Sequence, residues 1–300
     1  MSVPATDPFF SVIIPTYNRA AQICDAVNSV VLQTYKLWEV IVVDDGSSDN
    51  TKSVLESIKD ERVRYLYQQN AGVSTARNTG AAAAKGKYLL FLDSDDRFTE
   101  GYLESLSVEF AMNSCTIGFG YARYIDPNGK EIVHVKPEKS NGKFGPPLAG
   151  AFAISKELFQ LIGGYDTKLA YSENTEFFLR LKLQKKLHEN SVCIVDREGV
   201  IVNFRDSRER FNTYSSAKYK SIAHFLKKHA DYFANEPEAF ANYKTIYALG
   251  AFQHGDIDEA RKSIGQVIMK KPLRLKAYLQ YLLFAIPFLA RLYWKQPDTR

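Results

Sequence analysis

Residues 88–96 read YLLFLDSDD, an apolar run that ends abruptly in three carboxylates. Five consecutive apolar side chains predict a strand that is buried on both faces, as in a parallel sheet. The acids then lie at the carboxyl end of that strand, where open α/β sheets bind their ligands. Asp93 and Asp95, two positions apart, can face one divalent cation together with substrate phosphates. The alternative is that Asp95 or Asp96 caps a helix that begins near Thr99.

The same alternation of strand and helix precedes this stretch. Three short apolar runs predict strands over residues 9–14, 38–43 and 63–67. Each run is followed by a polar loop and then by a segment with helical character, which makes successive β-α units. Repeated units of this kind predict a parallel, doubly wound sheet that is covered by helices. The loops that carry Tyr17, Asp45 and Asp95 should then lie on one edge of the sheet.

The pattern becomes less regular after residue 101. Further strands are predicted over residues 117–124, 132–135, 192–195 and 200–204. Ser155 should cap a helix over 156–162. A second acidic cluster, SENTE, then opens an amphipathic helix, and its two glutamates, Glu173 and Glu176, share one helix face because they are three positions apart.

Beyond residue 212 the sequence shows only helical periodicity. The predicted helices cover residues 219–229, 240–252, 257–269 and 273–294. Residues 249–272 look like half of a tetratricopeptide-type repeat, and since one unit cannot build a solenoid we expect a local helical hairpin. The last helix is basic at both ends, and its apolar run is shorter than the roughly 20 residues that cross a membrane. It either lies on a membrane surface or packs on the domain with a basic edge.

Composition indicates an ordinary folded protein of one large domain or a domain with an appendage. Hydrophobic residues make up 45% and charged residues 24% of the 300 positions, so intrinsic disorder is not expected. The net charge of +5 is uneven, because residues 204–300 hold 17 Lys/Arg against 9 Asp/Glu. That excess predicts an anionic partner, such as a membrane surface or phosphate. Nucleic acid is not expected, since no nucleic-acid-binding motif accompanies the charge.

The cysteines are Cys24, Cys115 and Cys193, an odd number at wide spacing without a CxxC pair. We therefore expect neither a disulfide framework nor a zinc site, and we expect a reducing compartment. Residues 1–8 lack the basic and apolar regions of a signal peptide. The predicted location is the cytoplasm, peripheral to the inner membrane face.

Four motifs occur in a fixed order within residues 11–96. They are SVIIPTYNR at 11–19, VVDDGSSD at 42–49, ARNTG at 76–80 and FLDSDD at 91–96. Together they resemble the family 2 glycosyltransferases, which have the GT-A fold. The later GGYD at 163–166 and the acidic helix extend the resemblance to about residue 210. The resemblance implies a Rossmann-like α/β domain over residues 1–211 with a mostly parallel sheet and flanking helices. Residues 212–300 would form a separate all-helical extension.

The resemblance also implies a nucleotide-sugar site at the predicted sheet edge. Its donor-binding residues would be Pro15, Thr16, Tyr17, Arg19, Asp44, Asp45, Arg77, Asp93 and Ser94. Asp45 would accept a hydrogen bond from the base N–H, and Arg77 would lie near the base or diphosphate. Asp93 and Ser94 would contact the ribose. Asp95, with Asp93, would bind the Mn²⁺ or Mg²⁺ that neutralises the departing nucleoside diphosphate.

The second acidic cluster departs from the family pattern. Members commonly have Glu-Asp there, with the aspartate as general base, whereas this chain has Asn174 in the aspartate's place. An amide cannot accept the proton of an acceptor hydroxyl. Glu173 or Glu176 must then act as the base of an inverting reaction, which we favour. Glu-Asn also resembles the site of retaining polypeptide N-acetylgalactosaminyltransferases, and one glutamate can serve only to favour the helix N-terminus.

These expectations describe an enzyme that moves a sugar, preferably from a UDP-sugar, to a saccharide hydroxyl with the help of a metal. A lipid-linked bacterial surface glycan is the expected acceptor. A sugar-nucleotide nucleotidyltransferase shares the sheet type, but residues 15–19 lack its Gly-rich basic phosphate loop. A nucleotide- or glycan-binding scaffold that has lost its base at Asn174 is the non-catalytic alternative.

Overall fold

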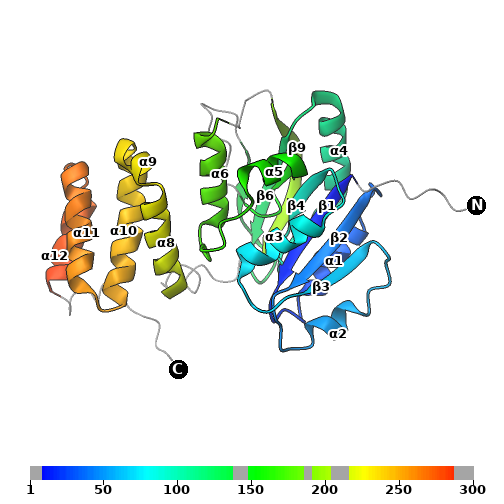
Figure 1. Cartoon of the computed structure of the whole chain (residues 1–300), viewed down its shortest axis with the longest axis horizontal. Helices are drawn as coiled ribbons and strands as arrows, with labels where there is room; N and C mark the ends of the chain where they lie inside the picture. Colours follow the sequence, from blue (N-terminus) through cyan, green and yellow to red (C-terminus); the bar gives the residue numbers. More distant parts are fainter. Residues whose placement is uncertain (1–8, 138–147, 186–190, 204–215, 287–300) are drawn as a thin grey trace, which may run out of the picture. The chain divides into compact units, whose positions relative to one another are not determined.

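The computed structural model describes residues 9–137, 148–185, 191–203 and 216–286. The chain divides into two compact units, of which the first comprises Met1–Thr167 and Glu173–Arg205 and the second Lys168–Ser172 and Asp206–Arg300. Figure 1 shows a sheet with covering helices in the first unit and helices in the second. The five residues Lys168–Ser172 thus belong to the second unit although both flanking segments belong to the first. The predicted boundary after residue 211 lies outside the described residues.

The first half of the sheet is parallel, as predicted. Its strands are β1 (Phe10–Thr16), β2 (Trp38–Asp44), β3 (Val63–Tyr67) and β4 (Tyr88–Phe91). They lie in the order β3-β2-β1-β4, and each neighbouring pair is parallel. The carboxyl ends of β1, β2 and β4 therefore meet at one edge, where their polar loops begin.

The second half makes the sheet mixed. Its strands are β5 (Arg97–Phe98), β6 (Ile117–Ile125), β7 (Glu131–Val135), β8 (Phe152–Ser155) and β9 (Val192–Asn203). Strand β8 is antiparallel to both β4 and β6, whereas β9 is parallel to β6. The sequence predicts two strands, over residues 192–195 and 200–204, where the structure has the single strand β9. Irregular pairing opposite Tyr121 of β6 accommodates the polar residues in the middle of β9.

Helices cover both faces of the sheet. They are α1 (Ile23–Val31), α2 (Thr51–Leu55), α3 (Val73–Ala83), α4 (Tyr102–Asn113), α5 (Lys156–Ile162) and α6 (Glu173–Leu183). The central strand β4 contributes Leu90 to one apolar cluster and Leu89 and Phe91 to the other. Both clusters are almost fully buried, as the unbroken apolar run predicts. Ser155 caps α5 as expected, since its Oγ accepts a hydrogen bond from Leu158 N at 3.2 Å.

The second unit is helical, as its periodicity predicts. Its helices are α8 (Ser216–Lys228), α9 (Ala230–Asn235), α10 (Pro237–Gln253), α11 (Ile257–Lys270) and α12 (Leu275–Ala285). Helices α10 and α11 form a hairpin at Gly255, which has φ of +85°, and Asp256 caps α11 through Glu259 N. Small buried residues such as Ala248 and Ala260 pack in this unit's core. Within the described ranges, no helix is both long and apolar enough to cross a membrane.

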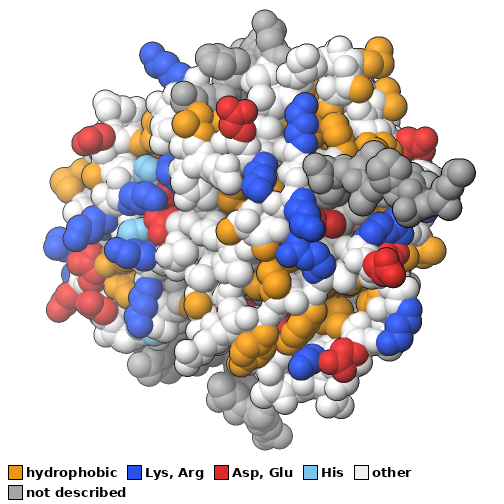
Figure 2. All heavy atoms as spheres, turned by 45° about the vertical axis from the view of Figure 1, so that its right-hand side comes forward, with side chains coloured by type: hydrophobic (Ala, Val, Ile, Leu, Met, Phe, Trp, Pro, Cys, Tyr) orange, Lys and Arg blue, Asp and Glu red, His pale blue; other side chains and the backbone are white. Residues whose placement is uncertain are grey.

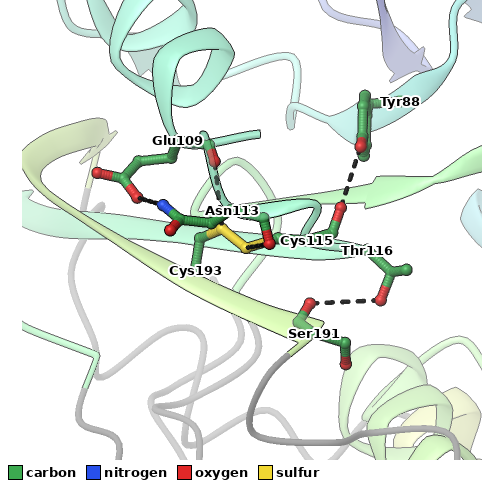
Figure 3. Close-up of a disulfide and its surroundings, with 7 residues drawn as sticks. All are labelled: Tyr88, Glu109, Asn113, Cys115, Thr116, Ser191 and Cys193. Atoms are coloured by element: carbon green, nitrogen blue, oxygen red, sulfur yellow. Dashed lines mark hydrogen bonds between the residues drawn. A yellow bond between two sulfur atoms is a disulfide. The ribbon is translucent and has the colours of Figure 1, made fainter. Parts of the chain in front are cut away.

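A disulfide joins Cys115 to Cys193, with their Cα atoms 5.9 Å apart, so the expectation that the cysteines stay unpaired is wrong. The two residues are 78 positions apart in sequence, which gives no local signal. Strand pairing brings them together, since Cys115 leads into β6 and Cys193 lies on the neighbouring β9 (Figure 3). Tyr88 Oη fixes the same segment by donating to Cys115 O at 3.0 Å. Cys24 is a free thiol.

The surface carries charges of both signs. On the face drawn in Figure 2, basic and acidic side chains are interspersed with hydrophobic ones. Exposed ion pairs such as Lys52 with Glu56, at 3.9 Å, are of the kind that adds little stability.

Candidate active site

The loops after β1 and β2 are fixed to each other by hydrogen bonds. Asn18 N donates to Ser47 Oγ at 2.9 Å, and Arg19 N donates to Thr51 Oγ1 at 3.1 Å. The guanidinium of Arg19 then lies 3.9 Å from the carboxylate of Asp95, which follows β4. The three loops predicted to share a sheet edge therefore do meet there.

Arg77 of α3 connects this edge to the second acidic cluster. Its Nη2 donates to Asp93 Oδ1 at 2.7 Å, and its Nη1 donates to Glu173 Oε1 at 2.8 Å. The side chain is only 3% exposed. Burial alone would lower the pKa of this guanidinium, but the adjacent Asp93 and Glu173 outweigh burial and raise that pKa. Arg77 is thus a permanent buried cation between two carboxylates that are 80 positions apart in sequence.

The residue after Arg77 holds the turn before α6. Asn78 Nδ2 donates to Tyr165 O at 2.8 Å, and Tyr165 N donates to Asn78 Oδ1 at 2.8 Å. Tyr165 Oη in turn donates to Asn174 Oδ1 at 2.8 Å. Asn174 therefore orients a buried tyrosine. Sequence reasoning missed Asn78 and Tyr165 as organisers of the site, because their pairing is visible only once α3 and the GGYD turn lie side by side.

The two glutamates of α6 lie in different environments. Glu173, whose side chain is 15% exposed, bonds to Arg77. Glu176 is fully buried, and both of its carboxylate oxygens accept from Arg180 Nε at 2.9 Å. Arg180 also donates to the carbonyls of Ile162 and Gly164, so this pair ties α6 to the end of α5. In this structure an acceptor hydroxyl cannot reach Glu176, which argues against its predicted role as a base.

Two predicted donor residues of the β2 loop are engaged within the protein. Asp44 is 1% exposed and accepts hydrogen bonds from Ser47 N and Tyr65 Oη, both at 2.8 Å. Both of its carboxylate oxygens therefore already accept hydrogen bonds from within the protein, and its role in donor binding stays a prediction. Asp45 is 5% exposed, and its oxygens accept from Gln68 Nε2 and from the backbone N–H groups of Ala71 and Gly72. It therefore shapes the entrance to α3.

The β1 loop offers a buried and an exposed group. Pro15 and Thr16 are buried in β1, whereas the Tyr17 side chain is 50% exposed. Within the described chain, the buried Oγ1 of Thr16 has no hydrogen-bond partner. Ser94, between the two aspartates of the β4 loop, is 7% exposed. These positions are compatible with a donor that lies over the strand ends.

The β4 loop does not cap a helix, so the alternative interpretation of these acids is wrong. Helix α4 begins at Tyr102, and its N-cap is Gly101. Asp96 instead accepts a hydrogen bond from Asn203 N at 3.0 Å, while Asn203 Nδ2 donates to Asp95 O. Strand β9 thereby holds the acidic loop in place. The two residues of this contact are more than 100 positions apart, so the local sequence gives no sign of it.

The carboxylates fit a cation that is completed by substrate. In the part of the chain that the structure describes, no group of three or more His, Cys, Asp or Glu side chains can hold a metal ion. Asp93 and Asp95 both follow β4 at this edge, and their side chains are 38% and 9% exposed. Mg²⁺ sites of this type use one or two carboxylates and take their other oxygens from phosphate and water.

The first half of the chain resembles known proteins in sequence. The profile of Glycosyl transferase family 2 matches residues 11–160, which is half of the chain. The chain belongs to this family. A putative teichuronic acid biosynthesis glycosyltransferase of Bacillus subtilis, TuaG, is 42% identical over 120 residues, covering 38% of this chain and 47% of TuaG. An uncharacterized glycosyltransferase of Rickettsia typhi is 30% identical over 205 residues, covering 63% and 64% of the two chains.

Solved structures show the same fold over nearly the whole chain. S. aureus TarS 1–349 in complex with UDP-GlcNAc superposes with a TM-score of 0.59 and covers 97% of this chain and 93% of TarS 1–349. The sequence identity is 18%, so the likeness concerns the fold. This supports the predicted GT-A domain with a helical extension. The chain spans less than two thirds of the length of the two curated relatives described above.

Proposed function

We propose that this family 2 member transfers a sugar from a nucleotide sugar to a hydroxyl of a saccharide. The observation that carries the proposal is the buried bridge from Asp93 through Arg77 to Glu173. It joins a carboxylate of the donor loop to an acid at the start of α6. A transferase needs both a site for the leaving diphosphate and a base for the incoming hydroxyl, and this bridge connects a candidate for each.

In the proposed reaction Glu173 is the base. The acceptor oxygen attacks the anomeric carbon of the donor sugar and gives its proton to the Glu173 carboxylate. The bond from that carbon to the phosphate oxygen breaks, and its electron pair leaves with the nucleoside diphosphate. Arg77 orients Glu173 through one hydrogen bond and leaves its second oxygen for the acceptor. Attack from the face opposite the leaving group inverts the anomeric centre.

A divalent cation fits the diphosphate end of this site. Asp95, with Asp93, would hold it, and when bound it supplies Lewis-acid stabilisation of the leaving diphosphate. Arg19, 3.9 Å from Asp95, is placed to add a second positive charge. The TarS complex with UDP-GlcNAc supports a UDP-linked donor. The name of TuaG, which assigns it to teichuronic acid biosynthesis, supports a bacterial surface glycan as the acceptor.

Helix α12 supports contact with a membrane surface. One of its faces packs into the core of the second unit through Ala277 and Phe284. The other leaves a stripe of Leu275, Leu279, Leu282 and Ile286 between 47% and 80% exposed. Their spacing places them on one side of the helix. Basic residues next to this stripe, including Lys276, are suited to anionic headgroups, which would bring the enzyme to a lipid-linked acceptor.

The membrane proposal is tested by changing the stripe without touching the buried face. The double variant Leu279→Gln and Leu282→Gln should co-sediment less with vesicles that contain phosphatidylglycerol. Leu161→Gln, at a residue of α5 that is 60% exposed, is the matched control and should sediment like the wild type. Equal sedimentation of all three proteins would contradict a membrane role for α12.

The enzymatic proposal is tested by measuring UDP release from a panel of UDP-sugars with Mn²⁺ or with EDTA. Activity should need the metal. Asp95→Ala should weaken metal-dependent donor binding in calorimetry by about tenfold or more, because a charged ligand is lost. Glu61→Ala removes an exposed carboxylate elsewhere and is the control. Nucleotide binding without hydrolysis or transfer by the wild type would indicate a binding scaffold instead.

A further inference from the structure

The helical unit contains a cavity of its own. Its volume is about 410 Å³, within the range of small-ligand sites. Helix α8 contributes Leu226 and Lys227, helix α9 contributes Phe233, and helix α10 contributes Phe240 and Lys244, with further lining residues on these helices. The end of α11 adds Lys270. All of these residues belong to the second unit, so the cavity does not depend on the GT-A domain.

The charged side chains that line the cavity are all positive. It combines three lysines with apolar and aromatic side chains and includes no carboxylate. Lys270 Nζ is held by the carbonyls of Phe233 and Ala234 at 3.0 and 2.9 Å, and it lies 4.7 Å from the Phe240 ring centroid. Two of its three N–H groups are thus used by backbone carbonyls, and the ammonium keeps its positive charge. The lining therefore favours a negatively charged ligand.

The other two lysines differ, because Lys244 already has a carboxylate neighbour whereas Lys227 has none in the described part of the chain. Lys244 lies 4.6 Å from the Tyr247 ring centroid and 3.8 Å from Glu259, and burial lowers the pKa of its ammonium group. Its side chain is 15% exposed, so its position is defined by packing. Lys227 is exposed at the rim and has no ion-pair partner among the described residues. A bound anion would give it one.

We infer that this cavity binds an acidic sugar chain, with a carboxylate or phosphate group on the lysines and a sugar ring against the apolar wall. Lysine is a common ligand for such anions, and aromatic walls with a few polar groups are typical of small-ligand sites. The inference rests on the proposed function in one respect, which is that the acidic sugar chain is taken to be the acceptor glycan. The unit would then hold part of the acceptor outside the reaction centre and raise its local concentration.

The C-terminal segment of this chain is a less suitable occupant of the cavity because of its charge. Residues 287–300 of this chain hold Arg291, Lys295 and Arg300 against one acid, Asp298. A basic segment is a poor partner for a cavity lined by lysines. A lipid bilayer requires protruding apolar groups, which α12 supplies, whereas Phe233 of the cavity is 2% exposed.

The test measures binding to the full chain by calorimetry, without any donor. The acidic probes are an oligogalacturonate and an oligo(glycerol phosphate), and a maltooligosaccharide of similar length is the neutral probe. Lys227→Glu reverses a rim charge, and Ala230→Phe fills the cavity from an exposed position of α9 without changing charge. Lys220→Glu is the matched control, because it makes the same charge change on α8 about 10 Å away.

The inference predicts that at least one acidic probe binds and that the neutral probe does not. Lys227→Glu and Ala230→Phe should each weaken binding about tenfold or more, and Lys220→Glu by less than about threefold. Failure of both acidic probes, or equal losses in Lys227→Glu and Lys220→Glu, would overturn it. So would binding of phosphatidylglycerol vesicles that depends on Lys227 while neither glycan binds. UDP release without acceptor should stay unchanged in these variants, so a failed transferase proposal would be recognised separately.

Discussion

Replacing Arg77 by methionine tests whether the buried bridge organises the site. The change removes the cation and keeps most of the volume, so it leaves Glu173 and Asp93 facing each other without a counter-charge. Breaking a buried ion pair by removing one partner costs about 3 to 5 kcal/mol. The Glu173 carboxylate, 15% exposed, should carry most of that cost, whereas Asp93 is 38% exposed and its share is reduced by solvent screening. We therefore expect a loss of about 3 kcal/mol, or about 6 to 12 °C in Tm.

Urea denaturation measures this loss, and two further variants make it specific. Lys52→Met breaks an exposed pair and should cost about 0.5 kcal/mol or less. Adding Glu173→Gln to Arg77→Met removes the unpaired buried charge and should recover part of the stability. The reasoning is refuted if Arg77→Met costs less than about 1 kcal/mol, or if the double variant is no more stable than the single one.

Three further outcomes are expected. Glu173→Gln should lower kcat of UDP release with acceptor by about 100-fold or more. Glu176→Gln should lower stability by about 3 kcal/mol in urea denaturation. For Glu39, burial would raise the pKa of its carboxyl, but hydrogen bonds from Lys85 N, Ser11 and Arg64 outweigh burial and lower it from the usual 4.5. The stabilisation that Glu39 provides is therefore complete above pH 4.5, and it is lost as the pH falls through the lower pKa of the folded protein. Glu39→Gln should flatten this part of the curve of unfolding free energy against pH. Without reductant, one thiol per denatured chain, that of Cys24, should react with a thiol reagent.

The parallel half of the fold could be predicted because its information is local. Strand β4 has an apolar run without interruption, and its two faces enter two separate clusters in the structure. Strand β5, with two residues, is too short to produce a periodic pattern. Strand β8 is antiparallel to both of its neighbours, β4 and β6, and a short apolar run does not show in which direction a strand will pair.

The candidate site could be predicted to the level of its loops but not of its bonds. The position of Asp95 follows from the strand before it. The hydrogen bonds that Asp44 accepts from Ser47 N and Tyr65 Oη are not revealed by a motif. The different environments of Glu173 and Glu176 depend on the location of Arg77 and Arg180, which helical spacing does not reveal.

The segment Lys168–Ser172 has a consequence for how this protein can be divided. It belongs to the second unit and immediately precedes Glu173. Within that unit Ala170 N donates to Ser221 Oγ at 3.0 Å, and Lys218 lies 4.5 Å from the Tyr171 ring centroid. A truncated enzyme that ends near residue 205 keeps every proposed donor-binding residue but loses the partners of this segment. The chain therefore has no single cut that separates a catalytic half from an accessory half, because the last residues before the proposed base fold with the helices.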